Sequence, residues 1–273
     1  MRKKTKTFVI VFAVLFVIAG LVYASSKINI TGGVITGFSI DGDGENNSVR
    51  EIPGAKLSTG SLHKGLVFDM PLKIGYTKEE TPGSEIMTDR TPYSNDGQNY
   101  GAVVGADYTT FDGVDDIVNC GNDPSLDLTQ AFTISTWLKP HGADEGGYVA
   151  GRYQATDAGY MMRWEGTSNQ LRFYYHHTGG VSSLAVFTDD DVWVNAVITF
   201  DHGDVAFYRN GIPAGTSTGI TITSNPTLSF AIGCRSGGVG AGHFFNGSIS
   251  DVRLYNRVLS LSEIKLLYDR GRR

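Results

Sequence analysis

The sequence predicts an all-β protein, a sandwich of two antiparallel sheets with one short C-terminal helix and an apolar helix at the N-terminus. The composition supports this class, because 35 Gly, 14 Phe and 13 Tyr stand against only 5 Met and 19% charged residues, a balance that favours strands and turns. Apolar residues also alternate with a period of two in many short segments. Turn residues separate these segments every 8–12 residues or so, which is typical of a two-sheet sandwich.

The first 24 residues have the pattern of an export signal. Residues 1–7 carry four basic side chains and no acid, residues 8–23 are continuously apolar or small, and Ala24 ends the segment. This order of basic, apolar and small regions is that of a signal peptide. The apolar run is slightly short for a membrane span, but an uncleaved signal anchor over residues 8–24 remains open. In either case we expect an extracellular or cell-surface protein that touches the membrane only through this segment.

Residues 25–62 differ in composition from the rest and are predicted to be a flexible stalk. Ile28–Thr31 and Val34–Gly37 could pair as a short hairpin. Asp41, Asp43 and Glu45 have the spacing that opens a calcium loop, but the glycine and the final acid of such a loop are missing. The stalk interpretation is therefore preferred. The net charge of −5 without a basic patch in the body excludes nucleic acid as an expected partner.

The body is predicted to form one domain over residues 63–270. A first strand is expected near Leu66–Leu72 and a long loop over residues 75–98. In Phe132–Lys139 the side chains alternate, with Phe132, Ile134 and Leu138 on one face. Further strands are predicted at Tyr148–Arg152, Tyr160–Glu165, Leu171–His177, Leu184–Phe187, Trp193–Asp201, Val205–Asn210, Thr218–Thr223, Leu228–Cys234 and Ser248–Tyr255.

The C-terminal helix begins at a capping box. Ser260 is the expected N-cap, and Glu263 is placed to reach back to its N–H. Ile264, Leu267 and Tyr268 then share one apolar stripe, as expected of a helix that covers an open sheet edge.

Four motifs occur in the order found in one known family. The first is FDGVDDIV at Phe111 with FTISTWLKP at Phe132, and the second is WVNAVITFD at Trp193 with DVAFYRNG at Asp204. The third is FFNGSISDVRLYNR at Phe244, and the fourth is LSLSEIKLLY at Leu259. Over roughly residues 63–270 the chain thus resembles the laminin-G-like jellyroll modules of the concanavalin A-like lectin and glucanase superfamily. The resemblance implies a jellyroll sandwich. It does not fix the function, since this fold serves lectins, hydrolases and adhesion modules.

The same resemblance makes calcium a candidate cofactor. The family often holds a calcium ion at the sandwich rim or beside the last strand, and Asp112 and Asp251 are the matching positions. Carboxylates are the oxygen ligands that calcium prefers. Each also has a purely structural interpretation, because Asp112 can hydrogen-bond its own turn and Asp251 can pair with Arg253.

An outward-facing surface on two neighbouring strands is the candidate glycan site. In Leu171–His177 the alternation puts Arg172, Tyr174 and His176 on the solvent side, and Arg163 takes the same side on the preceding strand. Aromatic faces beside planar polar groups can hold a sugar. The alternative is that Tyr174 is only a cross-strand partner on an antiparallel sheet.

Cys120 and Cys234 are the two cysteines of the chain. In an oxidising compartment a disulfide between them is expected. Two buried free thiols are the alternative.

Catalysis is not expected. The acid spacing of the superfamily's retaining glucanases, which places two carboxylates about 5–5.5 Å apart, is not found among the glutamates. The sequence therefore predicts a non-catalytic recognition module that binds a glycan or a surface protein. A structural surface component without a small ligand and a glycoside hydrolase with an unusual acid pair are the alternatives.

Overall fold

The computed structural model describes residues 27–31, 34–39, 61–78, 81–142, 146–154, 158–176, 179–183, 191–236 and 243–271. The predicted export signal, the acidic stretch at Asp41 and the strand predicted at Leu184–Phe187 lie outside these residues. The chain divides into two units, Met1–Ser61 and Leu62–Arg273. In the first, β1 (Lys27–Thr31) and β2 (Val34–Ser39) pair as the antiparallel hairpin expected there. None of the helices in the described part is long and apolar enough to cross a membrane.

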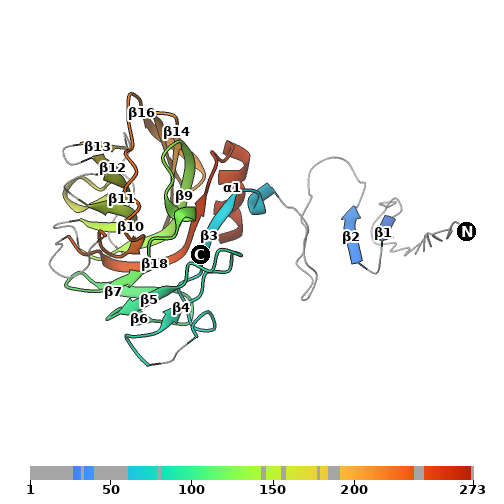
Figure 1. The fold of residues 1–273 in the computed structure, drawn as a ribbon, viewed down its shortest axis with the longest axis horizontal. Helices are drawn as coiled ribbons and strands as arrows, with labels where there is room; N and C mark the ends of the chain where they lie inside the picture. The colour runs from blue at the N-terminus through green and yellow to red at the C-terminus, as the bar shows by residue number, and fades with distance from the viewer. Residues whose placement is uncertain are drawn as a thin grey trace, which may run out of the picture. The chain divides into compact units, whose positions relative to one another are not determined.

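The second unit is a sandwich of two antiparallel sheets, as the sequence predicts (Figure 1). Among the described residues each sheet has eight strands. The first sheet runs in the order β13 (Gly179–Ser182), β12 (Gln170–His176), β11 (Ala158–Glu165), β10 (Gly147–Gln154), β17 (Ala231–Ile232), β8 (Ile117–Asn119), β5 (Gly97–Tyr100) and β4 (Ile86–Met87). The second runs β16 (Ile212–Ser217), β15 (Asp204–Arg209), β14 (Val194–Asp201), β9 (Ala131–Pro140), β18 (Asn246–Tyr255), β7 (Thr109–Asp112) and β6 (Val103–Val104), with β3 (Leu66–Met70) paired to β18. Short 3-10 turns are η1 (Ser61–His63), η2 (Pro124–Leu126) and η3 (Gly166–Ser168).

The core lies between the sheets and follows the predicted alternation. Phe132 of β9 meets the ring of Tyr160 at 4.6 Å and that of Phe200 at 5.3 Å, and all three are buried. Phe173 of β12 joins the same group. Offset and tilted aromatic pairs of this kind stabilise a core beyond the burial of their area.

The outer face of the second sheet is covered by α1 (Leu261–Gly271). Ile264 and Leu267 pack on Val197 and Tyr255 of that sheet, and Tyr268 stacks on Trp137 with 5.7 Å between ring centroids. The helix therefore covers a sheet face rather than the edge expected from the sequence. The capping box is present, since Ser260 N–H donates to the Glu263 carboxylate and Glu263 N–H to Ser260 Oγ.

One predicted strand is absent from the structure, and one predicted strand starts a residue later than expected. Residues 218–223 form no strand ladder, although the side chains of Ile220 and Ile222 are buried as the alternating pattern suggested. The strand in this region is β16, which ends at Ser217. Trp193, the first residue of the strand predicted over Trp193–Asp201, is half-buried and packs on Tyr108, and β14 begins at the next residue.

The predicted loop over residues 75–98 contains β4 and is anchored by a buried carboxylate. Asp89 accepts hydrogen bonds from the N–H groups of Asp69, Thr91 and Asn95. A carboxylate with this many donors is a structural anchor.

Candidate binding surface

The outer face of the first sheet carries a group of aromatic and charged side chains, called here the tyrosine–arginine cluster: Tyr148, Tyr153, Arg163, Glu165, Arg172 and Tyr174. Strand pairing assembles it, because Tyr148 lies opposite Arg163 and Arg163 lies opposite Arg172. Their neighbours Met162, Trp164, Leu171 and Phe173 point into the core. The period of two thus separates core from surface on β11 and β12, as predicted.

Glu165 holds the two arginines together. Its carboxylate forms an ion pair with Arg163 and lies 3.7 Å from Arg172 Nη1. Arg163 Nη1 also donates to the Tyr174 hydroxyl at 3.1 Å. The guanidinium groups of Arg172 and Arg163 lie 4.8 and 5.7 Å from the centre of the Tyr174 ring, within cation–π range. The side chains are therefore preorganised.

The cluster has a buried floor and a more open rim. Tyr148, Tyr153 and Arg163 are buried, whereas the Arg172 side chain is 33% exposed and Tyr174 is half-buried. Burial raises the pKa of Tyr153 to about 12, so its hydroxyl keeps its proton at neutral pH. Burial also raises the pKa of Tyr148, and the charges of Arg163 and Arg235 counteract only part of that rise.

Three of the four residues predicted for the glycan surface come together here. Arg163, Arg172 and Tyr174 belong to the cluster. His176 ends β12, but its side chain lies outside the described residues. Tyr148 and Tyr153 were not predicted. They are five residues apart, so simple alternation would put them on opposite faces, and the shift of register between Tyr148 and Ala150 brings both to one face.

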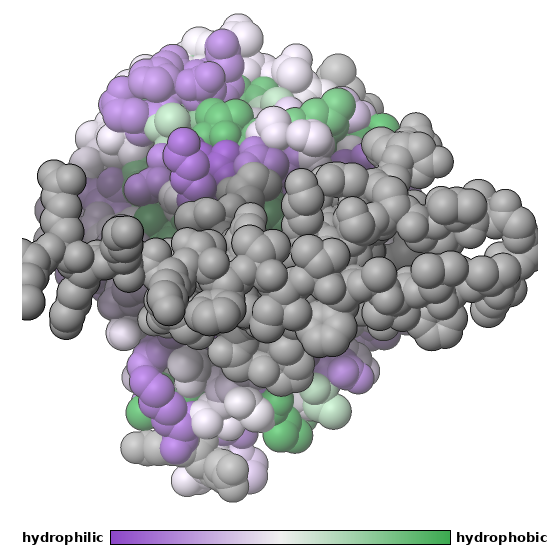
Figure 2. Space-filling view, turned by 90° about the vertical axis from the view of Figure 1, so that its right-hand side faces the viewer, coloured by the Kyte–Doolittle hydropathy of each residue, from purple (hydrophilic) through white to green (hydrophobic). Residues whose placement is uncertain are grey.

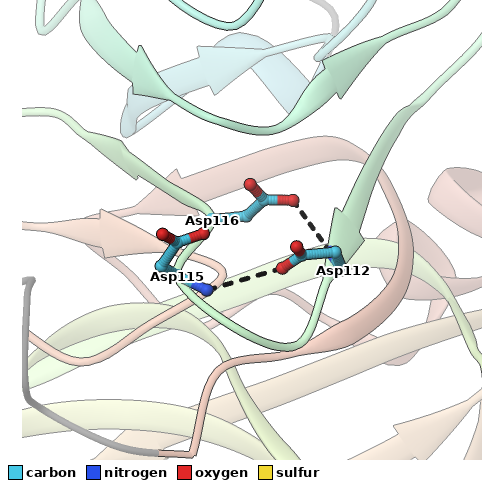
Figure 3. A group of neighbouring side chains, drawn as sticks. All are labelled: Asp112, Asp115 and Asp116. Atoms are coloured by element: carbon cyan, nitrogen blue, oxygen red, sulfur yellow. Dashed lines mark hydrogen bonds between the residues drawn. The ribbon is translucent and has the colours of Figure 1, made fainter.

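Asp112 lies in a turn with two further acids (Figure 3). Carboxylate oxygens of Asp112, Asp115 and Asp116 lie within 4.8 Å of one another. The turn explains their approach, because Asp112 Oδ1 accepts from Val114 N–H at 2.7 Å and Asp116 Oδ2 accepts from Asp112 N–H at 2.8 Å. Burial raises the pKa of Asp116, with a smaller rise from the two neighbouring carboxylates. An all-oxygen group of this kind is suited to a hard cation such as calcium.

Asp251 is not part of that group. It lies on β18 five positions from Asn246, which pairs with Asp112. At a rise of about 3.3 Å per residue, this puts the two backbones roughly 16 Å apart. Asp251 Oδ1 is instead 3.7 Å from Arg253 Nη2. The two residues predicted as calcium ligands therefore cannot share one ion.

The two cysteines are free and buried, so the predicted disulfide is wrong for this structure and the alternative holds. Cys120 belongs to the core between the sheets, whereas Cys234 packs with Ile117 and Ala231 in a separate cluster. A disulfide requires side chains that point toward each other. Burial raises the pKa of both thiols, that of Cys234 to about 11.

Two stacked antiparallel sheets with a covering C-terminal helix define a jellyroll β-sandwich. The chain belongs to the concanavalin A-like lectin/glucanases superfamily, because the model of that family matches residues 112–265. This confirms the resemblance found in the motifs.

In two of the three similar proteins described next, the region that matches this chain is a small part of a longer chain. Adhesion G-protein coupled receptor V1 of Danio rerio is 29% identical over 149 residues, which is half of this chain and 2% of the receptor. Domain 4 of AbnA, an extracellular arabinanase of Geobacillus stearothermophilus solved with arabinotriose, has a TM-score of 0.58 at 16% identity over 74% of this chain and 98% of that one. Trypanosoma rangeli sialidase with the inhibitor DANA has a TM-score of 0.56 at 19% identity, over 80% of this chain and 34% of the sialidase. At these identities the two structures show the fold alone.

Proposed function

We propose that this chain is the recognition module of an exported or surface-tethered protein, and that it binds glycans through the tyrosine–arginine cluster without chemical turnover. The cluster is the observation that carries the proposal. It combines aromatic rings with planar donors in fixed positions on the sheet face that α1 does not cover. Binding sites of this kind lose little conformational entropy when the ligand arrives.

Charge favours an acidic glycan, one that bears a carboxylate or a sulfate. Arg163 and Arg172 share a single carboxylate, that of Glu165, and the charge of Arg235 also acts on Tyr148, in a chain whose overall charge is negative. Among the described residues the Arg172 side chain makes the 3.7 Å ion pair with Glu165 and the cation–π contact with Tyr174, and no side-chain hydrogen bond. Its guanidinium is therefore the group we expect to bind the acidic substituent in a bidentate manner.

Support for a sugar ligand also comes from a structural neighbour, since the AbnA domain was solved with arabinotriose. The similarity to an adhesion receptor of Danio rerio supports a role at the cell surface. Catalysis is disfavoured by the cluster itself. Among its described residues Glu165 is the one carboxylate and is engaged by two arginines, whereas glycoside hydrolysis ordinarily needs two carboxylates.

A glycan array probed with the full-length chain tests this function. We expect acidic oligosaccharides to be retained, and Arg172→Ala to weaken their binding roughly 10- to 100-fold, the effect of losing a charged hydrogen bond. Arg270→Ala is the matched control, because it removes the same charge from exposed α1. An equal loss of glycan binding in both variants would show that binding depends on the total positive charge of the protein and not on Arg172. An array without any bound glycan would favour the structural surface component, and release of product from aryl sialosides would favour a hydrolase.

A further inference from the structure

His243 lies beside the tyrosine–arginine cluster although it belongs to the segment that leads into β18. Its carbonyl accepts a hydrogen bond from Tyr148 N–H at 3.0 Å. Its ring meets that of Tyr148 nearly at a right angle, with 5.9 Å between the centroids, and its Nδ1 is 3.4 Å from Arg163 Nη2. His243 is exposed, whereas Tyr148 and Arg163 are buried. It is therefore a solvent-accessible histidine in contact with the buried floor of the cluster.

The backbone of His243 has an uncommon conformation. Its φ of +58° lies in the left-handed region, which few residues other than glycine, asparagine, aspartate and histidine adopt. Residues kept in such conformations are concentrated at binding sites and switches. In this conformation the ring contacts both Tyr148 and Arg163.

The contact with Arg163 defines the protonation state of the ring. A guanidinium group has only N–H donors, so His243 Nδ1 must be the acceptor of this hydrogen bond. His243 is therefore neutral in this geometry, and its one ring proton is on Nε2. A second proton on Nδ1 would place two donors and two positive charges face to face, and the hydrogen bond would be lost.

Charged and titratable groups surround His243 on several elements. From β10, β11 and β12 they are Tyr148, Arg163, Glu165, Arg172 and Tyr174, from the segment after β17 Arg235, and from the ends of β7 and β9 Asp112 and His141. Arg163 also pairs with Glu165 and donates to the Tyr174 hydroxyl, so it stays in the cluster when its hydrogen bond to His243 is lost. Burial raises the pKa of Tyr148, so this residue stays neutral as the pH falls.

His243 also lines a cavity of about 250 Å³ at one end of the sandwich. The other polar side chains of the lining are Asp112, His141 and Asn246. Asp112 Oδ1 accepts two backbone hydrogen bonds within its own turn, and His141 Nδ1 contacts the Asp191 carboxylate. Because the charge of Asp112 is thus partly compensated, and because His243 contacts the cluster directly, a charge on His243 acts mainly on the cluster.

From these contacts we infer that His243 makes the cluster pH-responsive, so that acidic ligands bind more tightly at about pH 5.5 than at about pH 7.5. The inference rests on the proposed function, because it concerns the regulation of the same site. With neutral His243 the two arginines and Glu165 sum to a charge of 2 − 1 = +1, and protonation of His243 raises it to +2. Histidine is the side chain that ordinarily changes charge between about pH 5 and 8.

The test measures the affinity of the full-length chain for one sulfated disaccharide by NMR titration at both pH values, since a sulfate ester stays ionised at both. We expect roughly three- to tenfold tighter binding at the lower pH, the range from an exposed ion pair to a charged hydrogen bond. His243→Asn should bind equally at both, because asparagine tolerates the left-handed conformation and keeps an acceptor but cannot be protonated. His243→Arg, which is always charged, should bind tightly at both.

His202→Asn is the matched control. His202 is another exposed histidine with a positive φ, of +48°, and its Nδ1 contacts Asp201 in the turn between β14 and β15 of the other sheet. This variant should keep the full pH dependence. A second measurement needs no ligand, because NMR of the ring nitrogens at about pH 7.5 should find the proton of His243 on Nε2. A proton on Nδ1 would overturn the inference.

The outcomes separate the inference from the proposed function. Equal wild-type affinity at the two pH values overturns the inference, and so does a pH dependence that survives in His243→Asn. In either case, binding that still requires Arg172 leaves the proposed function standing. A chain that binds no acidic glycan at either pH contradicts both.

Discussion

Asp112, Asp115 and Asp116 bring three negative charges into one turn. Hydrogen bonds from backbone N–H groups compensate part of the repulsion, since Asp112 accepts two and Asp116 accepts one. Burial is the main cause that raises the pKa of Asp116, and the remaining repulsion from Asp112 and Asp115 adds to that rise. A bound cation would remove this repulsion and stabilise the folded state.

The first prediction concerns calcium. With a dissociation constant near 10⁻⁴ M, 10 mM calcium should stabilise the domain by about 2.7 kcal/mol and raise its Tm by roughly 5–11 °C. Asp112→Asn should abolish most of the shift in a thermal melt, and Asp251→Asn should retain it, because Asp251 pairs with Arg253 elsewhere. Magnesium is the ionic control and should act weakly. A shift below one degree in the wild type would dismiss the metal.

The second prediction concerns the thiols. In native protein at pH 8 the reagent DTNB should react slowly, since Cys120 and Cys234 are buried and burial raises the pKa of Cys234 to about 11. After denaturation without reductant, two thiols per chain should be titrated. Cys234→Ser should then give one. No thiol in the denatured wild type would show that the protein contains the disulfide after all.

At the scale of elements, polar contacts of its first turn hold α1 in place in addition to its apolar stripe. Glu263 accepts from Ser260 N–H and pairs with Arg257 at 2.7 Å. The hydrogen bond from Arg257 is the main cause that lowers the pKa of Glu263 to about 2. This carboxylate therefore ties the helix to the segment after β18.

The third prediction follows from that pKa. Because the folded-state value lies below the ordinary 4.5, Glu263 stabilises the protein above pH 4.5, and the contribution is lost as the pH falls toward 2. Glu263→Gln should lower the free energy of unfolding at pH 7 by about 1–2 kcal/mol, after allowance for solvent screening, and hardly at all near pH 2. Urea titrations at both pH values measure this. A difference in the free energy of unfolding that does not change with pH would contradict this prediction. Glu263→Asp keeps the charge but shortens the side chain, so it separates the effect of the charge from that of the side-chain length.

The elements also show what sequence patterns can and cannot predict. Alternation identified the core-facing side chains of β9 and β12, because the ladders that join β9 to β14 and β12 to β11 have no register shift. It missed the shared face of Tyr148 and Tyr153, where a register shift intervenes. It placed a strand at residues 218–223, where Ile220 and Ile222 are buried without a ladder. The cluster joins three strands through pairing between distant residues, which a local pattern does not contain.

At the scale of the whole molecule, the packed domain includes Leu62, which precedes the first strand of the sandwich, β3. Leu62 is buried against α1 with Leu259 and Ile264, one position before the predicted start of the domain at residue 63. On the side of the molecule seen in Figure 2, the coloured hydrophobic residues occur in small groups among hydrophilic ones. Small separate groups need no partner to cover them.

The fourth prediction tests this boundary. A fragment of residues 61–273 should melt cooperatively, and one of residues 64–273 should melt roughly 3–12 °C lower, because burial of a leucine is worth about 1.5–3 kcal/mol. Leu62→Ala in the longer fragment is the control and should reproduce most of the loss. Equal melting of the two fragments would place the boundary after Leu62. A non-cooperative melt of the longer fragment would mean that the first 60 residues are needed for folding.

Asn246, which lines the cavity at the start of β18, is followed by Gly247 and Ser248. These three residues form an acceptor sequence for N-glycosylation, and the Asn246 side chain is exposed. A glycan attached there would lie beside the loops that line the cavity, next to the turn that begins at Asp112. Protein produced in a glycosylating host and protein produced in one without that machinery should therefore differ in how accessible this cavity is to other molecules.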